Sequence, residues 1–116
     1  MRFTGQVVKG QGFATLIFGL PTANLEFDEA ITLGAGVYSG YTTVGQDRYP
    51  SVIYIGPQGS EKFEAHLFGF SGQLYGQTLD IEILKLVSQH VAWEDEDQMK
   101  TKVLKDVQLA REYFGL

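Results

Sequence analysis

The chain has 116 residues, of which 44% are hydrophobic and 20% charged, and its formal net charge at pH 7 is -5. These values predict one globular domain over residues 1–116 and exclude a disordered or fibrous chain. Nucleic acid is disfavoured because the sequence shows no cluster of Lys and Arg. Disulfides, thiolate metal ligands and cysteine nucleophiles are excluded because there is no cysteine.

The sequence contains no window of about 18 apolar residues and no signal peptide at its N-terminus. We therefore expect a cytoplasmic protein that acts without a membrane, as a monomer.

Short β-branched and aromatic segments separated by turn residues fill most of the chain and predict a mainly β domain. The predicted strands lie near residues 2–9, 23–27, 36–44, 48–56, 63–70 and 77–86. Turns are predicted at Val44-Gly45-Gln46-Asp47 and at Ser71-Gly72-Gln73. Six meandering strands of this length favour closure into a small barrel over about residues 1–87, since closure removes exposed edges.

The last segment has a different pattern, with apolar residues recurring at spacings of three and four. These are Met99, Val103, Val107, Ala110 and Phe114. The spacing predicts one amphipathic helix over about residues 95–113, with its apolar stripe packed on the barrel. Asp95 and Gln98 have the spacing of a capping box, and Gly115 is expected to end the helix.

Residues 9–24 include the groups in this sequence that are best suited to binding a ligand. Gly10 and Gly12 let backbone N-H groups approach an anion, whereas Thr22 and Asn24 offer neutral oxygens that suit Mg²⁺. Residues two apart in a strand face the same side, so both side chains would serve one site. Lys9 is the only basic residue between Arg2 and Arg48, so bound phosphates would need a cation. Without the upstream glycines, closing a turn would be the simpler role for Thr22 and Asn24.

The segment around Glu64 alternates, which places Glu64, His66 and Phe68 on one face of a strand. A carboxylate in such a position can orient an alcohol and take its proton during phosphoryl transfer. The simpler alternative for a glutamate on an edge strand is solvation. His66 suits either a cleft or the surface, and His90 is expected to be neither a metal ligand nor catalytic.

The order of these motifs resembles that of the riboflavin kinases (flavokinases). The likeness begins with the glycine loop and Pro21-Thr22-Ala23-Asn24 and continues through four further motifs. These are Gly36-Val37-Tyr38, Ile55-Gly56, Glu64-Ala65-His66 and Leu74-Tyr75-Gly76. The resemblance implies a six-stranded antiparallel Greek-key barrel with a C-terminal helix, and ATP-dependent phosphorylation of riboflavin to FMN.

The resemblance also implies roles for individual residues. Thr22 and Asn24 would bind Mg²⁺ and the nucleotide, Glu64 would be the catalytic base, and Gly10 and Gly12 would form the phosphate loop. The flavin ring would lie in an apolar slot near the helix and the 87–94 loop. Trp93, at a position where the family has Phe, and Tyr75 would contact the flavin.

The sequence departs from the family pattern at several positions. Ala14 replaces a third loop glycine, Ser88 replaces an arginine, Gly69 stands where many members have Asp, and the 57–62 loop is short. Two alternatives therefore stay open: a barrel that binds a flavin or nucleotide without catalysis, and a kinase for another alcohol or donor. The bacterial family usually adds an adenylyltransferase domain that makes FAD, for which 116 residues leave no room, so FMN is the expected product.

Overall fold

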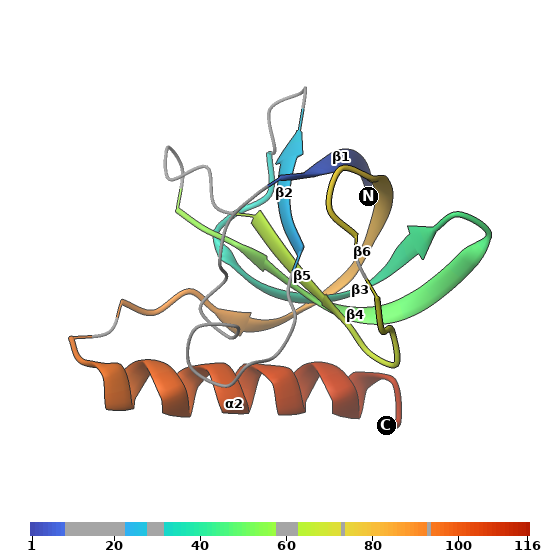
Figure 1. Cartoon of the computed structure of the whole chain (residues 1–116). Helices are drawn as coiled ribbons and strands as arrows, with labels where there is room; N and C mark the ends of the chain where they lie inside the picture. Colours follow the sequence, from blue (N-terminus) through green and yellow to red (C-terminus); the bar gives the residue numbers. More distant parts are fainter. Residues whose placement is uncertain (9–22, 28–31, 58–62, 73, 93) are drawn as a thin grey trace.

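The computed structural model describes residues 1–8, 23–27, 32–57, 63–72, 74–92 and 94–116. Six strands and one C-terminal helix appear in this part of the chain (Figure 1). The elements are β1 (Arg2–Val8), β2 (Ala23–Phe27), β3 (Gly36–Val44), β4 (Asp47–Ile55), β5 (Phe63–Leu67), β6 (Thr78–Gln89) and α2 (Glu96–Tyr113). None of the helices described is both long and apolar enough to cross a membrane.

The strands form a closed antiparallel barrel in the order β1-β2-β5-β4-β3-β6. This confirms the predicted barrel and its C-terminal helix. The expected simple meander is wrong, because β2 pairs with β5 and β3 pairs with β6. These two pairings join strands distant in sequence, and local patterns cannot predict such partners.

The strand bounds agree with the sequence pattern except at two ends. β5 ends at Leu67, short of the predicted residue 70, because the chain turns at Phe68-Gly69, where Gly69 has φ +82°. β6 continues to Gln89, beyond the predicted end at residue 86. The hairpin between β3 and β4 has the two-residue turn expected, with Val44 opposite Asp47 and Gly45 at φ +61°.

Two apolar clusters stabilise the fold. The barrel interior is filled by alternate strand residues, among which Ala65, Leu79 and Ile81 are at most 1% exposed. The second cluster lies on the outer face, where Ala110 of α2 packs with residues of β3, β4 and the segment after β5. Its buried members are Val37, Val52, Phe68 and Ala110, and Val107 and Phe114 pack against it. The predicted packing of the helix stripe on the barrel is confirmed for these helix residues.

The helix begins and ends as its sequence predicts. The Asp95 side chain accepts a hydrogen bond from the Gln98 N-H at 2.8 Å, and the Gln98 side chain accepts from the Glu94 N-H at 3.0 Å. Gly115, at φ +72°, ends the helix and donates its N-H to the Glu112 carbonyl at 3.0 Å. The two caps define the first and last residues of α2, which lies beside the barrel (Figure 1).

Gly40 of β3 lies opposite Ile83 of β6, next to a shift in the register of the two strands. A Cβ atom at Gly40 would lie 2.3 Å from the backbone oxygen of Glu82 and 2.6 Å from Cδ1 of Ile53. Because one of these atoms is backbone, the clash cannot be relieved by a side-chain rotation alone.

Substituting Gly40→Ala should therefore lower the free energy of unfolding by about 2 kcal/mol or more, through overpacking at the β3–β6 seam. Urea unfolding followed by circular dichroism measures this change. Gly34→Ala is the matched control, because nothing lies within 4 Å of a Cβ at Gly34. Equal stability of the two variants would contradict the assigned close approach.

Candidate active site

Glu64 points to the outer face of the barrel, because its neighbours Phe63 and Ala65 belong to the interior cluster. It is only 9% exposed, so the solvated alternative considered for it is wrong. Its direct cross-strand partners are Asn24 on β2 and Tyr54 on β4. Directly paired side chains have Cβ atoms about 4.5–5.5 Å apart. An amide, a carboxylate and a phenol thus stand side by side on one face.

This line of cross-strand partners continues around the outer face. Tyr54 lies opposite Val37 on β3, and Val37 lies opposite Ser88 on β6. The line runs from Asn24 to Ser88 across five strands, and we call it the outer row. α2 packs over its Ser88 end, because Lys102 of the helix bonds Ser88. The outer row therefore connects the carboxylate of Glu64 with the junction between barrel and helix.

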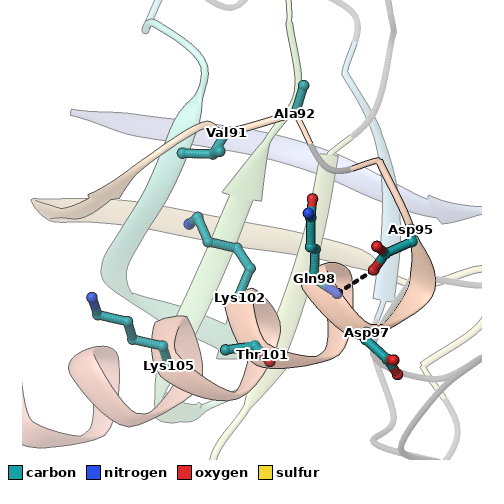
Figure 2. A pocket seen from close by; sticks show the side chains of 8 residues that line it. All are labelled: Val91, Ala92, Asp95, Asp97, Gln98, Thr101, Lys102 and Lys105. Carbon is teal, nitrogen blue, oxygen red and sulfur yellow. Dashed lines mark hydrogen bonds between the residues drawn. The ribbon is translucent and has the colours of Figure 1, made fainter.

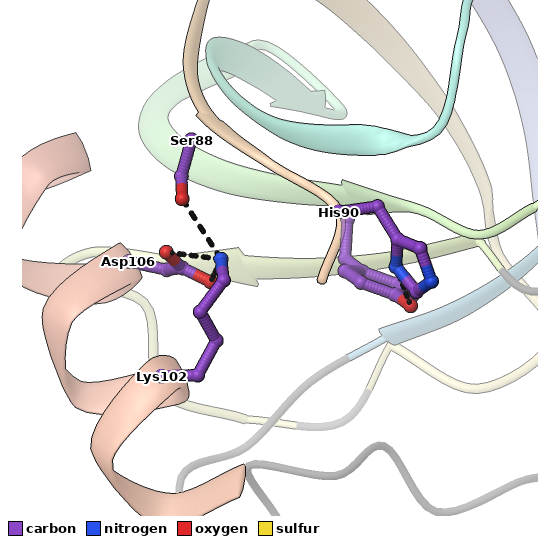
Figure 3. Close-up of polar contacts among 5 residues, drawn as sticks. Ser88, His90, Lys102 and Asp106 are labelled. Atoms are coloured by element: carbon purple, nitrogen blue, oxygen red, sulfur yellow. Dashed lines mark hydrogen bonds and ion pairs between the residues drawn. The ribbon is translucent and has the colours of Figure 1, made fainter. Parts of the chain in front are cut away.

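Lys102 makes a compact ionic contact at that junction (Figure 3). Its ammonium group donates to the Ser88 hydroxyl at 2.8 Å and to the two Asp106 carboxylate oxygens at 2.7 and 2.6 Å. The side chains of Lys102 and Asp106 are 19% and 9% exposed. Position 88 is where the family pattern has an arginine. The Lys102 ammonium beside this position is paired with the Asp106 carboxylate, so the contact as a whole carries no net charge.

Tyr54 connects the outer row to the loop that follows β6. Its hydroxyl lies 3.2 Å from Nδ1 of His90, at hydrogen-bonding distance, and the two rings are 6.1 Å apart. Burial raises the pKa of Tyr54 above its ordinary value of 10.0, and the negative charges of Glu64 and then Asp106 raise it further. The phenol is therefore neutral at physiological pH and keeps its proton for hydrogen bonding.

A cavity of about 510 Å³ opens between the loop after β6 and the first turns of α2. Val91 and Ala92 line it on the loop side, and Gln98, Thr101 and Lys102 line it on the helix side (Figure 2). Its volume lies in the range of small-molecule pockets, and it is widely open to solvent. The cavity shares Lys102 with the ionic contact at Ser88, so it adjoins the end of the outer row.

The structure brings together two of the predicted site residues, Asn24 and Glu64, as direct partners. Gly10, Gly12, Thr22 and Trp93, as well as Ala14, lie outside the described residues. Tyr75 is 50% exposed in the turn before β6, where Gly76 donates its N-H to the carbonyl of Val7 at the end of β1. It is not among the residues that line the cavity. The assigned roles of all these residues stay predictions.

Sequence reasoning missed Tyr54, Lys102 and Asp106. Alternation in β4 places Tyr54 on the same face as Val52, but only the pairing with β5 shows that it adjoins Glu64. The spacing of Lys102 and Asp106, four residues apart, was the available signal for an ion pair on one helix face.

Comparisons with known proteins agree with this architecture. The family model "Flavokinase: Riboflavin kinase" matches residues 1–114. A structure titled macrolide-efflux protein from Streptococcus pneumoniae has a TM-score of 0.82 at 24% identity, covering 95% of this chain and 38% of that one. Riboflavin kinase from Trypanosoma brucei has a TM-score of 0.69 at 22% identity, covering 97% of this chain and 75% of that one. These two likenesses show that the chain shares its fold with both structures.

The chain belongs to the riboflavin kinase family. Among curated relatives, the bifunctional riboflavin kinase/FMN adenylyltransferase of Escherichia coli strain K12 is 29% identical over 119 residues. The match covers 97% of this chain and 38% of the relative, so the chain spans well under half of that protein.

The contribution of the buried Lys102–Asp106 ion pair to stability can be compared with that of an exposed ion pair on the same helix. Lys102→Met keeps the aliphatic stem but leaves the buried Asp106 carboxylate without its ammonium partner. We expect the free energy of unfolding to fall by about 2–3 kcal/mol. Lys100→Met removes the exposed pair with Glu96, whose side chains are 42% and 69% exposed for lysine and glutamate, and should cost about 0.5 kcal/mol or less. Urea unfolding at neutral pH measures both, and similar losses would contradict the difference in burial.

The raised pKa of Tyr54 predicts a loss of stability in alkali. The unfolded state releases the phenolic proton near pH 10.0, whereas the folded state holds it to a higher pH. The contribution of Tyr54 is therefore fully present below pH 10 and is lost as pH rises toward the folded-state pKa.

Unfolding free energies at about pH 8 and about pH 10.5 test this loss. Tyr54→Phe should lose less stability over that interval than the unsubstituted chain. Tyr113→Phe, which removes a hydroxyl from a residue 44% exposed at the far end of α2, should behave like the unsubstituted chain. Identical pH dependence in all three proteins would refute the expectation.

Proposed function

We propose that this chain is a riboflavin kinase that transfers the γ-phosphate of ATP to the 5'-hydroxyl of riboflavin and makes FMN. The observation that carries the proposal is the direct pairing of Asn24 with Glu64 on the outer face of the barrel. Membership of the family supports the same reaction. The proposed partners are the two small molecules, and we expect the protein to act in the cytoplasm as a monomer.

Glu64 is the proposed catalytic base. Its carboxylate would accept a hydrogen bond from the 5'-hydroxyl and orient the oxygen toward the γ-phosphorus. As the new P-O bond forms and the bond to ADP breaks, the hydroxyl proton passes to the carboxylate. The limited exposure of Glu64 favours this role, because a substrate alcohol competes with little bulk water there.

Asn24 is the proposed ligand of Mg²⁺, together with Thr22. The donor chemistry fits, since the amide oxygen of Asn24 is a hard, neutral ligand beside a carboxylate. Bound Mg²⁺ would neutralise charge on the phosphates of ATP. Gly10 and Gly12 would contribute backbone N-H groups to the same phosphates. Asn24 itself would hold the nucleotide end of the reaction next to the base.

The cavity beside α2 is the proposed flavin site. Val91 and Ala92 supply an apolar wall, and Trp93 follows them directly in the sequence. The cavity adjoins the outer row at Lys102, and the proposal requires the ribityl chain of a flavin there to extend along that row toward Glu64. Tyr75 is retained as a second proposed flavin contact, from the turn before β6.

Two alternatives to a riboflavin kinase remain, a binding barrel without catalysis and a kinase for another donor or alcohol. A binding barrel without catalysis was suggested by the serine at position 88 and by the apolar glycine loop, and Lys102 places an ammonium at that serine. Because that ammonium is paired with Asp106, it does not replace the arginine toward a ligand, and the binding module stays an alternative. A kinase for another donor or alcohol is tested by comparing ATP, CTP and GTP, and riboflavin with other alcohols.

The decisive assay incubates the protein with riboflavin, ATP and Mg²⁺ and separates the flavins. We expect FMN, and Glu64→Gln should lower kcat by about 10²-fold or more while leaving nucleotide binding within about twofold. Glu26→Gln is the control, because it neutralises an exposed glutamate on β2. No FMN at high protein concentration would refute the kinase assignment, and full activity in Glu64→Gln would refute the base.

A further inference from the structure

Val91 and Ala92, which form the loop wall of the cavity, are both exposed. Residues 90–92 follow the end of β6 and precede α2, and Val91 is 53% exposed. Within the described part of the chain, the Tyr54–His90 contact is the one side-chain hydrogen bond that joins residues 90–92 to a strand. The position of this wall therefore depends on a bond that starts from the outer row.

The geometry points to a role for this bond in the proposed reaction. Tyr54 is fixed in β4 and lies directly opposite Glu64, whereas His90 immediately precedes the two loop residues that line the cavity. A single hydrogen bond thus links the strand beside the base to the wall that would contact the flavin.

We propose that Tyr54 and His90 are positioning residues that hold residues 90–92 in the arrangement that binds the flavin. This inference rests on the proposed function. In the proposed reaction, neither Tyr54 nor His90 touches the reacting atoms. Tyr54 supplies a neutral hydroxyl on a rigid strand, and His90 transmits its position to the loop. The raised pKa of Tyr54 supports the role, because the hydroxyl stays protonated over the physiological range.

The effect should appear in substrate binding more than in chemistry. A loop that is no longer held would weaken the flavin complex and its transition state alike, which raises KM and leaves kcat unchanged. Loss of one neutral hydrogen bond in Tyr54→Phe should raise the KM for riboflavin by about fivefold. The KM for ATP and kcat at saturating riboflavin should stay within about twofold.

Substitutions of His90 provide a rescue test. The side-chain amide of Asn occupies nearly the place of Cγ and Nδ1 in histidine, so His90→Asn can retain the bond to Tyr54. His90→Ala cannot. We expect His90→Ala to show the raised KM for riboflavin and His90→Asn to stay within about twofold of the unsubstituted chain. Equal effects of both changes would overturn the proposal.

Hydrogen exchange tests the same bond without any activity. Peptides covering residues 84–92 should exchange faster in Tyr54→Phe than in the unsubstituted chain, with the change confined to residues 89–92. Tyr113→Phe is the control and should leave these peptides unchanged. Unchanged exchange in Tyr54→Phe overturns the proposal, and so does faster exchange with an unaltered KM for riboflavin.

Failure of the proposed function is distinguishable from failure of this inference. If the unsubstituted chain makes no FMN, the kinase assignment fails alone. Riboflavin binding, followed by quenching of flavin fluorescence, then replaces KM as the readout. A fivefold weaker Kd in Tyr54→Phe together with faster exchange would support the positioning role, and an unaltered Kd would overturn it.

Discussion

The candidate site depends on the register of β5 between β2 and β4. Strand side chains alternate between two faces, so a shift of one residue would turn Glu64 into the apolar interior and Ala65 outward. The apolar interior opposes such a shift, since Ala65 and Leu67 are at most 5% exposed inside the barrel. The same packing that stabilises the barrel thus fixes Glu64 opposite Asn24. Packing of the apolar interior therefore determines which side chains of β5 face outward at the candidate site.

The helix completes the site through charge as well as packing. Asp106 is 7% exposed, and a carboxylate so placed is stabilised only with a partner. Lys102 meets this need within one turn of the same helix and also reaches Ser88 on β6. One contact therefore neutralises a buried charge, joins α2 to the barrel and forms part of the cavity.

Local sequence patterns were sufficient to predict the strands and the helix, but they did not predict which strands pair with each other. Alternation around Glu64, the two-residue turn at Gly45 and the Asp95 cap each depend on residues close in sequence, and the structure confirms them. The β2–β5 and β3–β6 pairings depend on long-range closure, so a meander was wrongly expected. Tyr54 was missed for the same reason, because its proximity to Glu64 exists only through the pairing of β4 with β5. The family resemblance supplied the Greek-key order that periodicity could not.

The outer row also keeps Glu64 apart from the Lys102–Asp106 ion pair at its Ser88 end. Both cross-strand neighbours of Glu64 are neutral, an amide and a phenol, so neither forms an ion pair with its carboxylate. The ammonium of Lys102 directs its three hydrogen bonds to Ser88 and the two oxygens of Asp106. An ammonium has three donors, so its hydrogen-bonding capacity is used at the helix end of the row. A positive charge engaged in this way stabilises the junction between α2 and the barrel.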